Sequence, residues 1–307
     1  MTAAEKQRRA VLLLAHGSPD SVEQIPDFLL KVTGGRTLPP EVIEEIKHRY
    51  GRVGCFPLTH HTLKQADLLA EKLGIPTYVG MRNWHPLIPA TLRRMNADGI
   101  THATVICLAP QNSRTSVGLY RNSLRGPDCT MSFDFVESWH DHPRLIQAFA
   151  EKLKAGLERA AEEHGKIPPV IFTAHSVPER TILDGDPYEK QAKQTAALVG
   201  QAAGLKPSAW KFAFQSQGLS GGTWLGPTVE QTILELKNSG HNAVFMQPVG
   251  FLCDHIEILY DLDIAFKEFA TAQGMLFSRA ESLNDSPLLI SALAEIVQSR
   301  NAVTAAG

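Results

Sequence analysis

The chain has 307 residues, of which 43% are hydrophobic and 20% charged, and its formal net charge at pH 7 is -2. This composition supplies enough apolar material for a large core, and the length suggests about two domains. The small net charge excludes the strongly basic balance of nucleic-acid-binding proteins and the acidic tails typical of disorder.

The first residues carry several positive charges ahead of a short apolar run, 10–15, which ends at His16. A secretory signal needs an apolar segment of roughly 7–15 residues, and a membrane span needs about 20. The sequence meets neither requirement, so we expect a cytoplasmic protein.

The four cysteines, Cys55, Cys107, Cys129 and Cys253, are widely separated and form no C-x-x-C pair. The spacing typical of zinc fingers and iron–sulfur clusters is therefore absent. Cys107 and Cys253 lie in or beside apolar runs, where a reduced buried thiol is expected.

Short apolar runs alternate along the chain with amphipathic stretches of helical period. Such runs are typical of strands buried on both faces, as in parallel sheets. The expected strands are 11–15, 77–80, 104–109, 170–174, 211–215 and 243–249. The expected helices are 41–50, 62–73, 86–98, 142–163, 188–203, 227–239 and 255–272. This alternation predicts an α/β fold with parallel strands and helical crossovers.

The two halves of the chain also resemble each other. PLIPATLRRMNADGITHATVICLAP (86–110) matches PTVEQTILELKNSGHNAVFMQP (227–248) in order and register, and LAHGSP (14–19) matches TAHSVP (173–178). Two unrelated α/β units could share this pattern, but the agreement in order favours a duplication.

We therefore expect two similar Rossmann-like lobes with parallel sheets and a cleft between them. The first lobe is expected at 8–136, with a C-terminal helix at 286–300 packed on it, and the second at 137–285. Ligands of open α/β sheets bind outside the carboxyl ends of the strands. His16 and His175 each follow an expected strand, so both are placed to face the cleft. A lone histidine at a strand end is more often satisfied by backbone, so neither is strong evidence alone.

The stretch PVGFLCDHIEILYDLDIAF (248–266) follows a strand and enters a helix. Asp254 is a natural N-cap and Glu257 has capping-box spacing from it, which favours a structural role. Glu257 and Asp261 are four residues apart on one helix face, where like charges cost a few tenths of a kcal/mol, roughly. This favours a second interpretation, in which a cation or proton transfer uses both carboxylates.

Several motifs, taken in order, resemble the ferrochelatase family. They are YVGMRNWHP, LAPQNSRTS, TAHSVPER with GDPY, QSQG with WLGP, and PVGF with DHIEILYDLD. The resemblance runs from about Val11 to beyond Asn284, and the A-H-S-x-P and D-H-x-E-x-L-Y-x-x-D pair is its most specific part. It implies a chelatase-like fold and a lyase that inserts Fe²⁺ into a porphyrin in haem biosynthesis.

The resemblance implies that His175 and Glu257 are catalytic and contact the metal, with Asp261 as an outer acid. A neutral imidazole can take a pyrrole proton near pH 7, and a carboxylate can accept the second proton or hold iron. Arginines are suited to the porphyrin propionates. The expected porphyrin-binding residues are His16, Arg49, Tyr50, Tyr120, Arg36 and Arg82.

The expected partners are the porphyrin and ferrous iron as substrates, with a haem-accepting protein as a further possibility and no nucleic acid. We expect a monomer with no permanently bound cofactor and no iron–sulfur cluster. The segment GGRTLPPEVIEEIKHRY (34–50) resembles the coproporphyrin-using branch, which favours coproporphyrin III over protoporphyrin IX. His16, where that branch often has a tyrosine, adds a potential axial ligand for haem iron.

Three alternatives stay open at this point. A sirohydrochlorin-type chelatase would share the fold and the histidine. A haem- or porphyrin-binding protein without insertase activity is favoured by His16, because a stable axial ligand suits haem retention. A two-lobed small-solute binding protein is disfavoured by the missing export signal.

Overall fold

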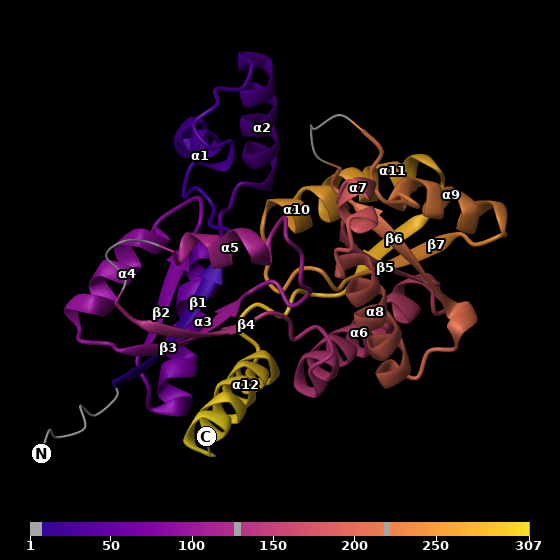
Figure 1. Ribbon diagram of the computed structural model, residues 1–307. Coiled ribbons are helices and arrows are strands. Elements are labelled where there is room, and N and C mark those ends of the chain that lie inside the picture. The colour runs from indigo at the N-terminus through magenta and orange to yellow at the C-terminus, as the bar shows by residue number, and fades with distance from the viewer. Residues whose placement is uncertain (1–7, 126–129, 218–221, 307) are drawn as a thin grey trace, which may run out of the picture.

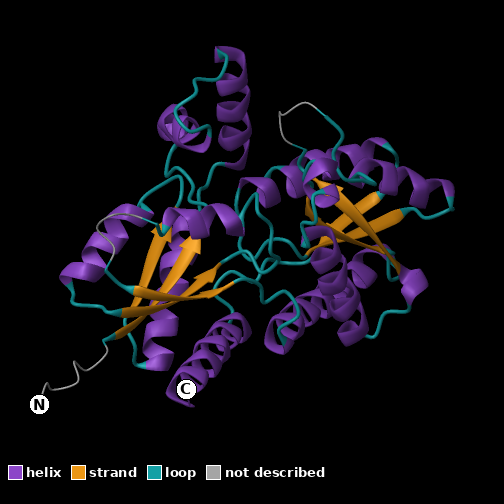
Figure 2. Cartoon of the chain, viewed as in Figure 1, coloured by secondary structure: helices purple, strands orange, loops and turns teal. Residues whose placement is uncertain are grey.

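The computed structural model describes residues 8–125, 130–217 and 222–306. Two parallel sheets, each flanked by helices, form two α/β lobes (Figures 1 and 2). This confirms the expected fold class. Cys129, and Gly218 of the QSQG motif, lie outside the described residues.

The two sheets have the same strand order. The first runs β2 (Thr77–Met81), β1 (Arg9–Ala15), β3 (His102–Cys107) and β4 (Ser132–Val136). The second runs β6 (Trp210–Gln215), β5 (Val170–His175), β7 (Ala243–Pro248) and β8 (Leu276–Arg279). Every paired strand is parallel to its neighbour. The central strands β1 and β5 are therefore equivalent, and each ends beside one of the two predicted histidines.

The repeated motifs also form the same local turn. Pro86 accepts a backbone hydrogen bond from Met81 at 2.7 Å, and Pro227 accepts one from Phe214 at 2.8 Å. The two similar sequence segments thus form the same turn in both lobes, at the ends of the edge strands β2 and β6.

The helices cover both faces of the sheets. Their bounds are α1 (Ile25–Val32), α2 (Pro40–Val53), α3 (Leu58–Leu73), α4 (Ile88–Ala97), α5 (Val117–Ser123), α6 (Pro143–His164), α7 (Glu179–Leu183), α8 (Tyr188–Ala203), α9 (Val229–Asn238), α10 (Ile256–Leu259), α11 (Lys267–Ala272) and α12 (Pro287–Ala306). Short 3₁₀ turns occur at η1 (Val22–Gln24) and η2 (Pro207–Ala209), and a π-helical segment, η3 (Asp261–Phe266), joins α10 to α11.

The strands and helices that the sequence did not predict are short or lie at an edge. The strands β4 and β8 are edge strands with mostly half-exposed residues, so they lack the continuous apolar run of a central strand. The helices α1, α5 and α7 have eight residues or fewer, and so small a number gives a weak periodic signal.

The two lobes share one apolar core. A single cluster of buried side chains includes Val11 from β1, Phe172 from β5, Phe245 from β7 and Leu293 from α12. The helix α12 packs on α3 of the first lobe and more extensively on α6, which itself packs on α8, β7 and β8. The C-terminal helix therefore joins the two halves.

Polar contacts join the lobes beside this core. Gln111 Nε2 donates to Thr195 Oγ1 at 3.1 Å and to the carbonyl of Val249 at 3.0 Å. Arg114 pairs with Asp184 at 2.7 Å. The LAPQNSRTS motif, which contains Gln111 and Arg114, thus contributes to the contact between lobes.

The helices α1 and α2 rise above the end of β1 (Figure 1), and α2 contacts α10 of the second lobe. Phe28, Tyr50 and Trp84 belong to a small buried cluster against which Ile256 of α10 packs. Arg52 of α2 also pairs with Glu268 of α11 at 2.7 Å. None of the helices in the described ranges is long and apolar enough to span a bilayer.

Candidate active site

The two predicted histidines occupy equivalent positions at the carboxyl ends of β1 and β5. His16 Nδ1 lies 3.0 Å from the carbonyl oxygen of Gly17, and His175 Nδ1 is hydrogen-bonded to the carbonyl oxygen of Ser176. A carbonyl oxygen only accepts, so Nδ1 carries the proton in both rings. In the neutral form of each ring, Nε2 therefore presents a lone pair.

Glu257 faces the free nitrogen of His175. Glu257 Oε2 lies 3.6 Å from His175 Nε2. The two side chains are 33% and 34% exposed, yet Oε2 itself is buried and accepts no hydrogen bond from the described residues. Two lone pairs that face each other repel, so the arrangement is favourable when a proton or a cation lies between them. The pair can therefore exchange a proton or hold a metal ion.

The loop after β7 brings Glu257 to this position. A Cβ atom on Gly250 would lie 2.9 Å from Ala174 Cβ, so only glycine allows the loop to pass this close to the end of β5. Phe251 then packs between two rings, with centroids 6.4 Å from His175 and 4.5 Å from His255.

Three imidazoles surround the Glu257 carboxylate. Burial raises its pKa, but the nearby rings of His175, His255 and His16 act in the opposite direction, and the net pKa lies below its usual value. Burial lowers the pKa of His255, whose Nδ1 is 3.1 Å from the carbonyl oxygen of Cys253. The net direction favours the ionised form of Glu257.

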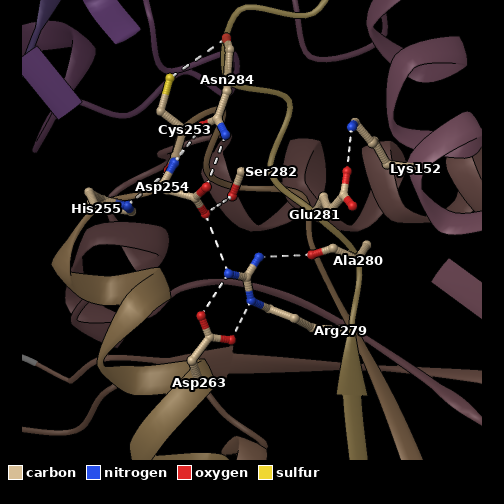
Figure 3. Close-up of polar contacts among 10 residues, drawn as sticks. All are labelled: Lys152, Cys253, Asp254, His255, Asp263, Arg279, Ala280, Glu281, Ser282 and Asn284. Atoms are coloured by element: carbon tan, nitrogen blue, oxygen red, sulfur yellow. Dashed lines mark hydrogen bonds and ion pairs between the residues drawn. The ribbon is translucent and has the colours of Figure 1, made fainter. Parts of the chain in front are cut away.

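The capping interpretation of Glu257 is wrong. His255, not Asp254, is the N-cap of α10, and its side chain makes no capping hydrogen bond. The Asp254 carboxylate instead accepts hydrogen bonds from Ser282 Oγ at 2.7 Å and Asn284 Nδ2 at 2.9 Å (Figure 3). Arg279 also lies 3.5 Å from the Asp254 carboxylate. Because Ser282, Asn284 and Arg279 occupy this carboxylate, it does not cap α10.

The Arg279 side chain contacts Asp254 and Asp263, which lie on either side of Glu257 in the chain (Figure 3). Its guanidinium forms a two-pronged ion pair with Asp263 of η3, at 2.5 and 2.7 Å, and reaches Asp254 on the other side. Bidentate arginine–carboxylate pairs fix orientation as well as distance. Arg279, the last residue of β8, therefore fixes the position of α10 and η3.

Asp261 lies next to Glu257, as its spacing predicted, but on a π-helical turn. The Ala265 amide donates to the Tyr260 carbonyl at 2.9 Å, an i to i+5 bond, and such turns are frequent at functional sites. Ser216 Oγ donates to Asp261 Oδ2. Burial raises the pKa of Asp261 to about 6, and the charge of Glu257 acts in the same direction. Asp261 can therefore bind and release a proton near neutral pH.

The predicted porphyrin-binding residues lie on the first lobe, in several different settings. Tyr50 is buried and stacks on Phe56, and burial raises its pKa to about 12. Arg49 lies over the ring of Tyr260, at 5.3 Å, and pairs with Glu45. The Arg49–Tyr260 contact connects α2 to the junction between α10 and η3.

Two further predicted residues contact each other, and one is isolated. The Arg82 guanidinium lies over the Tyr120 ring at 5.7 Å, and burial raises the pKa of Tyr120. Arg36 is exposed between α1 and α2, and in the described part of the chain its side chain is not joined to the other five.

Sequence reasoning missed Asn83, whose Nδ2 lies 2.9 Å from His16 Nε2. A signal was present, because Asn83 lies two residues after the end of β2, the neighbour of β1. The carboxyl ends of adjacent parallel strands meet at one edge of a sheet.

A separate polar hollow of about 740 Å³ lies behind η3. Asp254, Asp263, Arg279 and Asn284 are among its lining residues, whereas His175 and Glu257 are not. We place the candidate site at the His175–Glu257 pair, because the polar groups of the hollow are already paired with one another.

Comparisons with known proteins indicate the family to which the chain belongs. A family model described as ferrochelatase matches residues 8–301. A ferrochelatase of Acidobacterium capsulatum is 52% identical, over 96% of this chain and 95% of its own length. A coproporphyrin III ferrochelatase of Geobacillus sp. strain WCH70 is 34% identical, over 96% of this chain and 98% of its own.

Among solved structures, the sirohydrochlorin chelatase SirB from Bacillus subtilis, in complex with cobalt, is similar in fold. The TM-score is 0.55 with 12% sequence identity, over 94% of this chain and 93% of that chain. At this identity the likeness concerns the fold alone.

Replacement of Arg279 by methionine should destabilise the protein by about 2–4 kcal/mol. Removing one partner of a buried ion pair costs about 3–5 kcal/mol, and the 38% exposure of the Asp263 side chain reduces this. Urea unfolding measures the change. Lys152→Met is the matched control, because the Lys152–Glu281 pair is 32% and 59% exposed and should contribute about 1 kcal/mol or less. Equal effects of the two variants would show that Arg279 is not an anchor.

Asp261→Asn should make the protein more stable than the wild type at pH 7 but not at pH 4. The pKa of Asp261 is raised from 3.8 to about 6 in the folded protein. A group with a raised folded-state pKa contributes stability below the unfolded pKa, and this contribution is lost as pH rises through about 6. Melting temperatures across this range test the sign, with Asp27→Asn as an exposed control. A difference that shrinks with rising pH contradicts the prediction.

Proposed function

The chain belongs to the ferrochelatase family, the lyases that insert ferrous iron into a porphyrin in haem biosynthesis, and we propose that His175 and Glu257 carry that reaction here, with coproporphyrin III as the porphyrin. The observation that supports the two roles is the facing of His175 Nε2 and Glu257 Oε2 at 3.6 Å. Both atoms are otherwise without a hydrogen-bond donor in the described residues, and both are ligand types that iron(II) accepts.

The reaction replaces two pyrrole N–H protons by one Fe²⁺ ion, so the protein must accept two protons for each porphyrin metallated. His175 Nε2 takes the first proton, since Nδ1 is already committed to the carbonyl of Ser176. The resulting imidazolium is stabilised by the Glu257 carboxylate beside it.

Glu257 then accepts the second proton or holds the incoming iron. Its neighbour Asp261, with a pKa of about 6, can take the proton onward. A carboxyl whose pKa lies near the working pH is suited to both uptake and release. Proton transfer from Glu257 to Asp261 thus moves protons away from the porphyrin nitrogens.

The first lobe supplies groups for the porphyrin edge. Tyr50 and Tyr120 are buried, whereas the guanidinium groups of Arg36, Arg49 and Arg82 are suited to propionates. Coproporphyrin III carries four carboxylates and protoporphyrin IX two, so several cations favour the former. The coproporphyrin III ferrochelatase among the relatives supports the same choice.

We also propose that the protein works in the cytoplasm as a monomer, without a permanently bound cofactor or iron–sulfur cluster, and passes its haem to an accepting protein. The sirohydrochlorin and solute-binding alternatives have no observation in their favour, since the likeness to SirB concerns the fold alone.

His175→Ala should reduce iron insertion by about 10² or more, and Glu257→Gln by a similar factor, because general acid–base groups contribute about 10²–10⁴. Porphyrin binding, measured by quenching of porphyrin fluorescence, should persist in both. Anaerobic metallation assays measure turnover. His241→Ala, an exposed histidine on the second lobe, is the control. Near-wild-type turnover in either site variant would reject the proposed role of that residue.

Coproporphyrin III should be metallated with a higher kcat/KM than protoporphyrin IX when the two are compared side by side under anaerobic conditions. The additional carboxylates can each gain a charge-assisted hydrogen bond to an arginine. Equal values, or a preference for protoporphyrin IX, would contradict the proposed substrate while leaving the insertion activity in place.

A further inference from the structure

His16 and His175 make the same kind of hydrogen bond at Nδ1 but have different neighbours at Nε2. His16 and His175 each follow or end a central strand, and each donates from Nδ1 to the carbonyl of the next residue. At Nε2 they diverge: His175 faces the Glu257 carboxylate, whereas His16 meets the side-chain amide of Asn83 at 2.9 Å. One lone pair is open to a metal or a proton, and the other is already engaged.

The direction of every hydrogen bond around His16 is fixed. Arg82 Nε lies 3.4 Å from Asn83 Oδ1, and a guanidinium only donates, so Oδ1 points toward Arg82. Nδ2 of Asn83 is therefore turned toward His16 Nε2 and donates to it. At the far end, the carbonyl of Gly17 only accepts, from Nδ1. The chain from Arg82 through Asn83 and His16 to Gly17 has one consistent polarity.

The backbone holds these groups in register. The Asn83 amide donates to the His16 carbonyl at 3.0 Å, and the Arg82 amide donates to the Ala15 carbonyl at 3.0 Å. Gly17 has a φ of 87°, and a Cβ atom there would lie 2.8 Å from Trp84. The two loops can approach this closely only with glycine. Asn83 is 3% exposed, so its amide has little freedom to turn away.

Nε2 is the atom through which His16 could bind iron. The His16 residue is exposed, although desolvation by the surrounding protein and the nearby charge of Arg82 both lower its pKa. A neutral imidazole ligates iron through a ring nitrogen whose lone pair is free. The hydrogen bond from Asn83 occupies that lone pair.

We propose that Asn83 masks Nε2 of His16, so that this imidazole is withheld from haem formed at the site. This inference rests on the proposed function and assigns Asn83 as a positioning residue that acts through His16. Haem held by an additional imidazole would leave more slowly, so the mask favours product release.

The mask can be tested without porphyrin. In protein labelled with ¹⁵N in its histidine rings, His16 should show the Nδ1-protonated tautomer, with Nε2 shifted as expected for a hydrogen-bonded lone pair. Asn83→Leu, which keeps the side-chain volume, should retain the tautomer and shift Nε2 toward the free value. An Nε2-protonated ring, or an Nε2 shift that is the same in both proteins, would overturn the proposal. Asn83→Ala serves as the second variant if the leucine variant does not fold.

The consequence for haem is tested with preformed ferric coproporphyrin haem. The wild type should give a five-coordinate or mixed-ligand spectrum without a bis-imidazole low-spin signature. Asn83→Leu should acquire that signature and release haem about tenfold more slowly, and His16→Ala in the same background should remove both effects. A bis-imidazole spectrum already present in the wild type, or none in Asn83→Leu, would overturn the proposal.

This design separates the two levels of inference. Failure of haem to bind any of the proteins would count against the proposed function, while the tautomer of His16 in the porphyrin-free protein still decides whether the mask exists. Normal metallation with an unmasked His16 would count against the mask alone.

Discussion

The lone pair that His175 Nε2 presents to Glu257 depends on the hydrogen bond made by the other ring nitrogen, Nδ1. Because Nδ1 donates to the carbonyl of Ser176, Nε2 is left to face the buried carboxylate oxygen at 3.6 Å. The end of β5 fixes that carbonyl, and the close passage of Gly250 over Ala174 fixes the loop that leads to Glu257. The reacting groups therefore come from backbone geometry at the edge of one sheet, and the chemistry of proton removal follows from it.

A second set of contacts holds the carboxylate side of the pair. Arg279 connects Asp254, ahead of α10, with Asp263 in η3, so the short helix between them is anchored at both ends. On its other side, Ile256 of α10 packs against the cluster around Tyr50 of the first lobe. A segment with an irregular π turn would otherwise be free to shift. Its rigidity comes from these flanking anchors, and sites held on both sides keep their geometry best.

Much of the fold could be predicted from the sequence, because six of the described strands, the central four and the edge strands β2 and β6, have apolar runs, and the repeated motifs predicted two similar lobes. The edge strands β4 and β8 could not, since their half-exposed residues lack that pattern. At the site, the pairing of His175 with Glu257 was implied by the resemblance to the ferrochelatase family. The role of Asp254 could not be predicted, because its partners Ser282, Asn284 and Arg279 lie about 25–30 positions away. The masking of His16 likewise depends on Asn83, distant in sequence.

The apolar cluster shared by both lobes and α12 makes the molecule one cooperative unit. Each lobe also has a buried cluster of its own, around Leu12 in the first and around Ile233 in the second. The shared cluster adds side chains from both lobes and from α12, such as Leu69, Leu153 and Leu293, and each fully buried large side chain is worth roughly 1.5–3 kcal/mol. Movement of one lobe against the other would disturb these contacts, so the shared cluster restrains the distance between His16 and His175.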